Sequence, residues 1–197
     1  MDVFLKLFEE QAEFSEFFKD LKANKTPINT LGVSDSVRAH LIYAVCKKLD
    51  TPCLAVTADD ESARRLFEDL QYFFGEDVFL FPKTDLLFYD VEAKGKDITT
   101  LRLDILGRLA EDEKPCYVVT TAEALGEVTL PKEVYAQKVI SFKDGEDAEL
   151  DEIAQNLPEL GYRREDMVEG AGQFSIRGGI LNIYPVGVKS SLVDIKE

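Results

Sequence analysis

Hydrophobic positions follow two different spacings over the first 126 residues. Short runs are apolar at nearly every position, which is typical of strands buried on both faces of a sheet. Longer segments carry apolar residues at every third or fourth position, which predicts amphipathic helices. The predicted strands are 27–31, 51–57, 78–81 and 116–120, and the predicted helices are 1–23, 36–49, 59–74, 97–109 and the short 121–125. Because the two kinds of element alternate, we expect a parallel sheet and an α/β layer domain over residues 1–126.

The pattern changes after residue 126, where shorter elements follow one another. Residues 134–142 have the composition of one or two strands, and a helix over 149–157 is expected to end at Pro158. A short strand near Tyr162, a hairpin and a last strand over 192–195 complete the chain. We therefore expect a small α+β domain over residues 127–197.

The hairpin has the clearest pattern in this second domain. Its sequence, GQFSIRGGILNIYPVG at residues 172–187, places two apolar runs around Gly178-Gly179, a pair that tolerates positive φ at both turn positions. This register puts Ile176 opposite Leu181 and Phe174 opposite Ile183 on one face, which should join a core. The other face carries Gln173, Ser175, Arg177, Ile180, Asn182 and Tyr184. Arginine and tyrosine often anchor protein interfaces, although the pattern alone favours a merely solvated face.

Composition and charge exclude several classes of function. The 197 residues include 45% hydrophobic and 31% charged residues, and the net charge is −15. That charge argues against a dedicated DNA-binding or RNA-binding surface, because such a surface relies on clustered Lys and Arg. No apolar run is long enough to cross a bilayer, and the N-terminus does not resemble a signal peptide. We therefore expect a cytoplasmic protein without membrane contact.

Cysteine and histidine are too scarce for the common metal and nucleophile sites. Cys46, Cys53 and Cys116 are odd in number and lie in apolar surroundings, so they are interpreted as reduced core residues. His40 is the single histidine, which disfavours both a zinc site and a Ser-His-Asp triad. Paired carboxylates occur only on polar segments. We expect no catalytic residues, no bound metal and no cofactor.

Residues 32–39 occupy the position of a phosphate-binding loop between a strand and a helix. That motif requires G-x-x-x-x-G-K-[ST]. Gly32 is present, but Val37 replaces the second glycine, Arg38 the lysine and Ala39 the hydroxyl residue. Valine disfavours the loop conformation and alanine cannot ligate a metal ion. The loop is either a degenerate phosphate site or an ordinary strand-to-helix turn.

Two segments resemble a known family. GYRREDMVEGAGQFSIRGGILNIYPVG (161–187) resembles the second domain shared by the bacterial transcription-repair coupling factor (Mfd) and the excision-repair helicase UvrB. LFPKTDLLFYDVEAKGKDITTLRLDILGRL (80–109) resembles the loop and helix of domain 1A of the coupling factor. The degenerate phosphate loop favours the coupling factor, because UvrB keeps an intact one. Asn182 and Tyr184 stand where the family usually has Asp and Phe, which are mild departures.

This resemblance implies a function. The chain would be an N-terminal fragment with UvrB-like domains 1A and 2, which recruits UvrA without catalysis and links stalled RNA polymerase to nucleotide excision repair. The family's contact residues for UvrA map onto Arg163, Arg177 and Tyr184. The full-length family member is an ATP-dependent DNA translocase that also binds RNA polymerase and duplex DNA, through parts absent here.

Two other interpretations remain open. Residues 32–39 would also suit a nucleotide-binding domain of a UvrB-type helicase with altered phosphate contacts. DNA contact through the first domain is a weaker alternative, given the net charge of −15.

Overall fold

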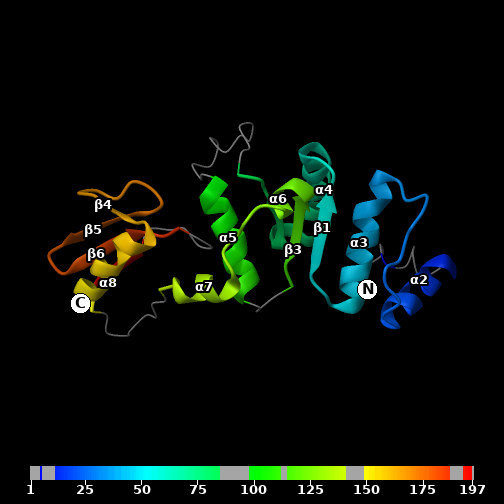
Figure 1. Ribbon diagram of the computed structural model, residues 1–197, viewed down its shortest axis with the longest axis horizontal. Helices are drawn as coiled ribbons and strands as arrows, with labels where there is room; N and C mark the ends of the chain where they lie inside the picture. Colours follow the sequence, from blue (N-terminus) through cyan, green and yellow to red (C-terminus); the bar gives the residue numbers. More distant parts are fainter. Residues whose placement is uncertain are drawn as a thin grey trace. The chain divides into compact units, whose positions relative to one another are not determined.

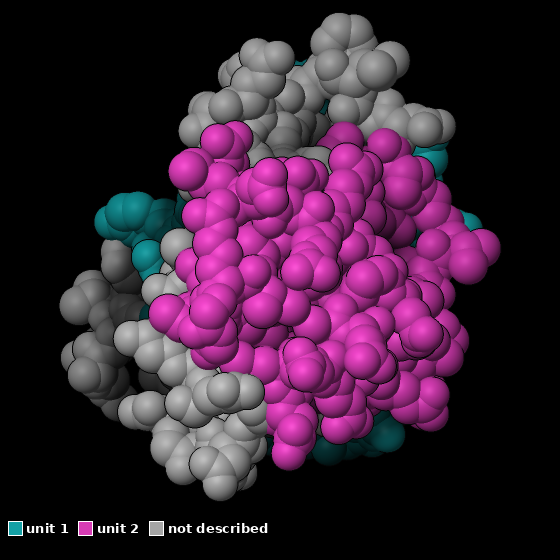
Figure 2. All heavy atoms as spheres, turned by 90° about the vertical axis from the view of Figure 1, so that its left-hand side faces the viewer, with its two compact units in different colours: residues 1–81, 113–126 teal, residues 82–112, 127–197 magenta. Residues whose placement is uncertain are grey.

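The computed structural model describes Leu5 and residues 12–84, 98–111, 115–140, 149–186 and 193–196. The chain divides into two compact units, shown in teal and magenta in Figure 2. Unit 1 comprises residues 1–81 and 113–126, and unit 2 comprises residues 82–112 and 127–197. The domain boundary after residue 126 stays a prediction from the sequence.

Unit 1 contains a three-stranded parallel sheet, as the α/β pattern predicts. Its strands are β1 (Cys53–Thr57), β2 (Val78–Phe81) and β3 (Tyr117–Thr121), in the order β1-β3-β2 (Figure 1). Cys53 and Val78 both pair with Tyr117, so β3 is the central strand. The side chains of β3 are buried throughout, which explains its continuous apolar run.

Helices connect and cover these strands. They are α2 (Ala12–Lys22), α3 (Asp35–Leu49), α4 (Asp60–Phe74), the 3₁₀ turn η1 (Gly75–Asp77) and α6 (Ala122–Leu125). Helix α4 begins as expected at Asp59, whose carboxylate accepts a 2.7 Å hydrogen bond from the Ser62 amide. The core lies between α3, α4 and the sheet, where Phe74 stacks on Tyr117 with ring centroids 3.7 Å apart.

Two strand predictions in unit 1 need correction. Residues 27–31 form no strand; they are largely exposed, with Leu31 95% exposed, so no neighbouring strand supplies the hydrogen bonds that a strand needs. The sequence predicts a β1 that is buried on both faces, but Leu54 and Val56 are about half exposed (55% and 47%). Leu54 and Val56 alternate with Cys53 and Ala55, which pack against the core, so one face of β1 is covered and the other is open.

Unit 2 combines short helices with a four-stranded mixed sheet. The helical elements are α5 (Ile98–Glu111), α7 (Lys132–Gln137), α8 (Leu150–Asn156) and η3 (Leu157–Leu160). The strands are β4 (Arg163–Arg164), β5 (Gln173–Arg177), β6 (Ile180–Tyr184) and β7 (Val193–Lys196), which lie in that order across the sheet (Figure 1). Strand β4 runs parallel to β5, and the other pairs are antiparallel.

The predicted hairpin register is confirmed. Ile176 pairs with Leu181 and Phe174 with Ile183, and these residues pack with Leu150 of α8 and Leu157 of η3 in the core of the sheet. Gly178 and Gly179 have φ angles of 57° and 79°, so both turn positions use the left-handed region that glycine permits.

One prediction in unit 2 is wrong. Val134, expected to begin a strand, lies in helix α7, and residues 138–140 are irregular. Pro131 precedes the first turn of α7, and its carbonyl accepts a 2.9 Å hydrogen bond from Tyr135, which favours helix over strand. The remainder of that prediction (141–142) lies outside the described residues, as do most of the N-terminal helix before residue 12 and the proposed cap at Asp147.

Within the described ranges, no helix is long and apolar enough to cross a membrane.

Candidate functional site

The three residues assigned to partner binding lie on one face of the mixed sheet. Arg163 pairs with Gln173, and Gln173 pairs with Tyr184, so their side chains form one row across β4, β5 and β6. Arg177 lies four residues after Gln173 on the same strand and therefore on the same side. We call this side of the sheet, opposite the core, the outer face; its residues are Arg163, Gln173, Ser175, Arg177, Ile180, Asn182 and Tyr184.

The outer face is accessible, and local hydrogen bonds hold its border in place. Arg163 and Arg177 are exposed, and Tyr184 is half-buried. The Arg177 guanidinium donates a hydrogen bond to the carbonyl of Asp166. The side-chain oxygen of Gln173 accepts hydrogen bonds from the amides of Glu169 and Gly170, at 2.8 and 3.1 Å. The chain between β4 and β5 is thus fastened to β5.

Arg164 differs from its neighbour Arg163. It is also exposed, but its register partner is Phe174, a core residue, so it belongs to the opposite side of the sheet. The sequence-based expectation that Arg164 points away from the Arg163 side therefore agrees with the strand pairing.

The arginines of the mixed sheet differ from the others in their electrostatic partners. The chain has eight arginines. Arg38, Arg65 and Arg102 form ion pairs, and Arg64 and Arg108 interact with other residues. Among the described residues, Arg163, Arg164 and Arg177 have no ion pair with any carboxylate. In a chain of net charge −15, two guanidinium groups on the outer face, those of Arg163 and Arg177, thus form no ion pair within the described ranges.

The degenerate phosphate loop adopts a different arrangement from a working one. Gly32 has φ 76°, and α3 follows with Ser34 as its N-cap. Arg38 forms a 2.8 Å ion pair with Asp35, on the same helix. The Ala39 side chain is buried in the core, with 1% exposed, so a hydroxyl at this position would not face a ligand. The missing strand before Gly32 removes a further feature of the phosphate-loop motif.

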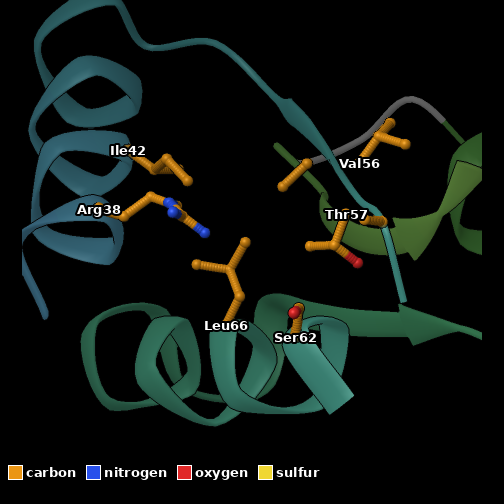
Figure 3. A pocket seen from close by; sticks show the side chains of 8 residues that line it. Arg38, Ile42, Val56, Thr57, Ser62 and Leu66 are labelled. Atoms are coloured by element: carbon orange, nitrogen blue, oxygen red, sulfur yellow. The ribbon is translucent and has the colours of Figure 1, made fainter. Parts of the chain in front are cut away.

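A cavity of about 390 Å³ lies beside this loop, between α3, β1 and α4. Figure 3 shows the side chains of Arg38 and Ile42 from α3 and of Leu66 from α4 extending into the same space. The polar side chains that line it already have partners: the Ser62 hydroxyl donates to the Asp59 carboxylate at 3.1 Å, and the Thr57 hydroxyl lies 3.0 Å from the Asp59 carbonyl. Few hydrogen-bonding groups remain for a phosphate.

Comparison with known proteins places these features in context. Residues 140–196 match the family model of the UvrB interaction domain. The chain is 30% identical over 94% of its length to the transcription-repair-coupling factor of Bacillus subtilis, and 31% identical over 79% of its length to that of Staphylococcus haemolyticus. The resemblance to transcription-repair coupling factors is confirmed. The chain spans 16% and 13% of the length of these two relatives.

The match to the UvrB interaction domain covers the outer face in full. Arg163, Arg177 and Tyr184 all fall within residues 140–196, as do α8 and the mixed sheet. The loop of residues 32–39 lies outside this segment, although the coupling-factor relatives align with most of the chain. The outer face thus lies within the segment that matches the UvrB interaction domain.

Sequence reasoning missed a buried arginine in unit 2. Arg102 of α5 is 6% exposed, and its guanidinium donates hydrogen bonds to Glu127 at 2.7 Å and to the Pro82 carbonyl at 2.6 Å. The Glu127 carboxylate also accepts the Thr84 amide at 3.0 Å. The signal was present, because Arg102 lies on the apolar stripe that Ile98 and Ile105 define.

None of the three cysteines forms a disulfide, and Cys46 and Cys53 interact with each other. A hydrogen bond with Cys53, together with burial, raises the pKa of the Cys46 thiol, and the same hydrogen bond lowers the pKa of Cys53. No group of three or more His, Cys, Asp or Glu side chains suited to a metal ion occurs in the described part of the chain.

Proposed function

We propose that this chain is a non-catalytic module that recruits UvrA within a transcription-repair coupling factor, in the cytoplasm. In this role it connects RNA polymerase stalled at damage with nucleotide excision repair, while polymerase binding, duplex DNA binding and ATP-dependent translocation belong to other parts of the whole protein. The observation that carries the proposal is the outer face, where Tyr184 accompanies Arg163 and Arg177, two arginines that form no ion pair among the described residues.

The chemistry of the outer face suits a protein partner with acidic residues. Each guanidinium offers a planar set of N–H donors that can bind a carboxylate through two hydrogen bonds. Tyr184 adds a flat apolar surface and a hydroxyl group. Since the two arginines have no acidic partner among the described residues, binding does not first require an internal ion pair to break.

The absence of catalysis and of a cofactor is part of the same proposal. Arg38 is engaged with Asp35, and the hydroxyl groups of Thr57 and Ser62 are engaged with Asp59. The loop of residues 32–39 therefore retains the position of a phosphate site without its donors, which supports a structural role for the first unit.

Titration of UvrA against the chain and two charge-reversal variants tests the proposal. We expect Arg163→Glu and Arg177→Glu each to weaken binding by about tenfold or more, because each replaces a central cation by a repelling charge. Arg65→Glu is the matched control, since Arg65 is an exposed arginine of α4 in unit 1. Parent-like binding by both outer-face variants would disprove this site, and the absence of UvrA binding by the parent would disprove the function.

A further inference from the structure

An open cavity lies beside strand β5 in the mixed sheet. Its volume is about 390 Å³, and it is lined by Arg164, Glu165, Asp166, Ser175, Ile176 and Arg177. Ser175 belongs to the outer face, two residues before Arg177 and two after Gln173. Arg164 and Ile176 belong to the opposite side of the sheet, so the cavity lies along β5 and borders both sides, the outer face included.

Ser175 is an unusual residue for the middle of this face. Only 6% of the residue is exposed, yet its hydroxyl has no hydrogen-bond partner in the described ranges of the chain. A hydroxyl that has no partner in the protein but stays accessible can bond to water or to a ligand group. The hydroxyl oxygen of Ser175 is not fully enclosed by protein atoms. A group that enters the cavity can therefore reach it.

Arg177 supplies donors beside this hydroxyl. One terminal nitrogen of its guanidinium donates to the Asp166 carbonyl, which fixes the side chain along the edge of the cavity. A guanidinium carries five N–H donors, and the described residues use no others of Arg177. A hydroxyl and a held guanidinium together can satisfy both oxygens of a carboxylate.

We propose that this cavity receives one aspartate or glutamate side chain of UvrA, bound by the Ser175 hydroxyl and the remaining N–H donors of Arg177. This inference rests on the proposed UvrA-binding function and adds Ser175 to the contact residues. Glu165 and Asp166 also line the cavity and weaken its positive potential. A free anion is therefore held poorly, and the carboxylate must arrive as part of a larger protein interface.

Substitutions at Ser175 test the inference by UvrA titration. Ser175→Ala removes the hydroxyl and keeps the space, so we expect about tenfold weaker binding, as for loss of a hydrogen bond to a charged group. Ser175→Thr keeps the hydroxyl and should bind within about threefold of the parent. Ser175→Leu also fills the cavity and should bind at least as weakly as Ser175→Ala. Circular dichroism and thermal melting establish that each variant is folded; if Ser175→Leu is not, the alanine and threonine variants decide.

A double-mutant cycle tests whether Ser175 and Arg177 hold the same carboxylate. The loss from Ser175→Ala should be much smaller in an Arg177→Gln background, because the carboxylate is no longer held beside the hydroxyl. Strictly additive losses would overturn the shared site. If Ser175→Ala binds as the parent does while Arg163→Glu binds weakly, the inference is wrong and the proposed function stands. If Arg163→Glu and Arg177→Glu also bind as the parent does, the outer face is not the site, and if the parent itself does not bind UvrA, the proposed function is wrong as well.

Discussion

Each unit has a cavity of about 390 Å³ lined by at least one arginine, yet the two differ in how their polar groups are used. In unit 1, Arg38 is paired with Asp35, and Ser62 and Thr57 are engaged with Asp59. In unit 2, the Ser175 hydroxyl and most donors of Arg177 have no partner among the described residues.

This difference distinguishes the two cavities better than their volume does. The cavity in unit 1 lies beside the position that a phosphate-binding loop would take, and its hydroxyl groups and Arg38 already have partners within the protein. The cavity in unit 2 lies beside a short sheet without any catalytic motif, and its donors remain available. Hydrogen bonds that a protein has already made internally must be exchanged before a ligand can use those groups, which lowers the net gain from binding.

The largest expected effect comes from an arginine whose partners are all internal. Replacing Arg102 by Ala should lower the free energy of unfolding by about 3–5 kcal/mol, because it leaves the Glu127 carboxylate partly buried without its cation. Chemical denaturation measures this loss. The control is Arg164→Ala, which removes an exposed arginine that has no ion pair among the described residues and should change stability by less than about 0.5 kcal/mol. Equal losses for the two variants would contradict the distinction between used and available arginines.

A restored phosphate-loop sequence should fail to restore a phosphate site. The triple variant Val37→Gly, Arg38→Lys, Ala39→Ser recreates the consensus, but residue 39 faces the core, so the new hydroxyl should cost about 1–3 kcal/mol of stability. Calorimetry with ATP and magnesium should detect no saturable binding to the parent or to the variant. Micromolar binding by the parent would instead support the nucleotide-binding alternative.

A smaller effect is expected at the ion pair of α3. Arg38 and Asp35 are both substantially exposed (47% and 86%), so Arg38→Gln should lower stability by at most about 1 kcal/mol. UvrA affinity should remain that of the parent, since Arg38 lies in unit 1. A loss of UvrA affinity in this variant would show that the loop region contributes to the interface.

The sequence predicts some parts of the fold because local chemistry fixes them. The Gly178-Gly179 turn accepts only a narrow set of hairpin registers, so the pairing of Phe174 with Ile183 follows directly. Continuous apolar runs likewise identify β2 and β3. The strand expected at 27–31 is wrong because a local pattern does not say whether a partner strand is nearby.

The candidate site divides in the same way. Alternation along the hairpin is enough to place Arg177 and Tyr184 on one face, and the family resemblance adds Arg163. An arginine can form its ion pair with a residue distant in sequence, as Arg102 does with Glu127. The sequence alone therefore does not show which arginines form ion pairs within the protein. The sequence also does not predict that the Ser175 hydroxyl lies in a cavity, because a small polar residue on an outer face is ordinarily solvated.

The smallest expected effect concerns Asp59, whose carboxylate accepts a hydrogen bond from the Ser62 hydroxyl in the unit 1 cavity. Hydrogen bonds from the Ser62 amide and hydroxyl hold the pKa of Asp59 below its ordinary value of 3.8. The charged carboxylate of Asp59 therefore stabilises the fold fully at pH values above the ordinary pKa of 3.8. This stabilisation is lost as the pH falls through the lower pKa of the folded state. Asp59→Asn keeps a capping oxygen but cannot titrate, so its melting temperature should fall less steeply in acid than that of the parent. Thermal melts from neutral pH to about pH 2 measure the difference. Parallel curves for the two proteins would mean that the hydrogen bonds between Ser62 and Asp59 do not depend on the Asp59 charge. The Ser62 hydroxyl in the unit 1 cavity would then be held less firmly than its hydrogen bond indicates.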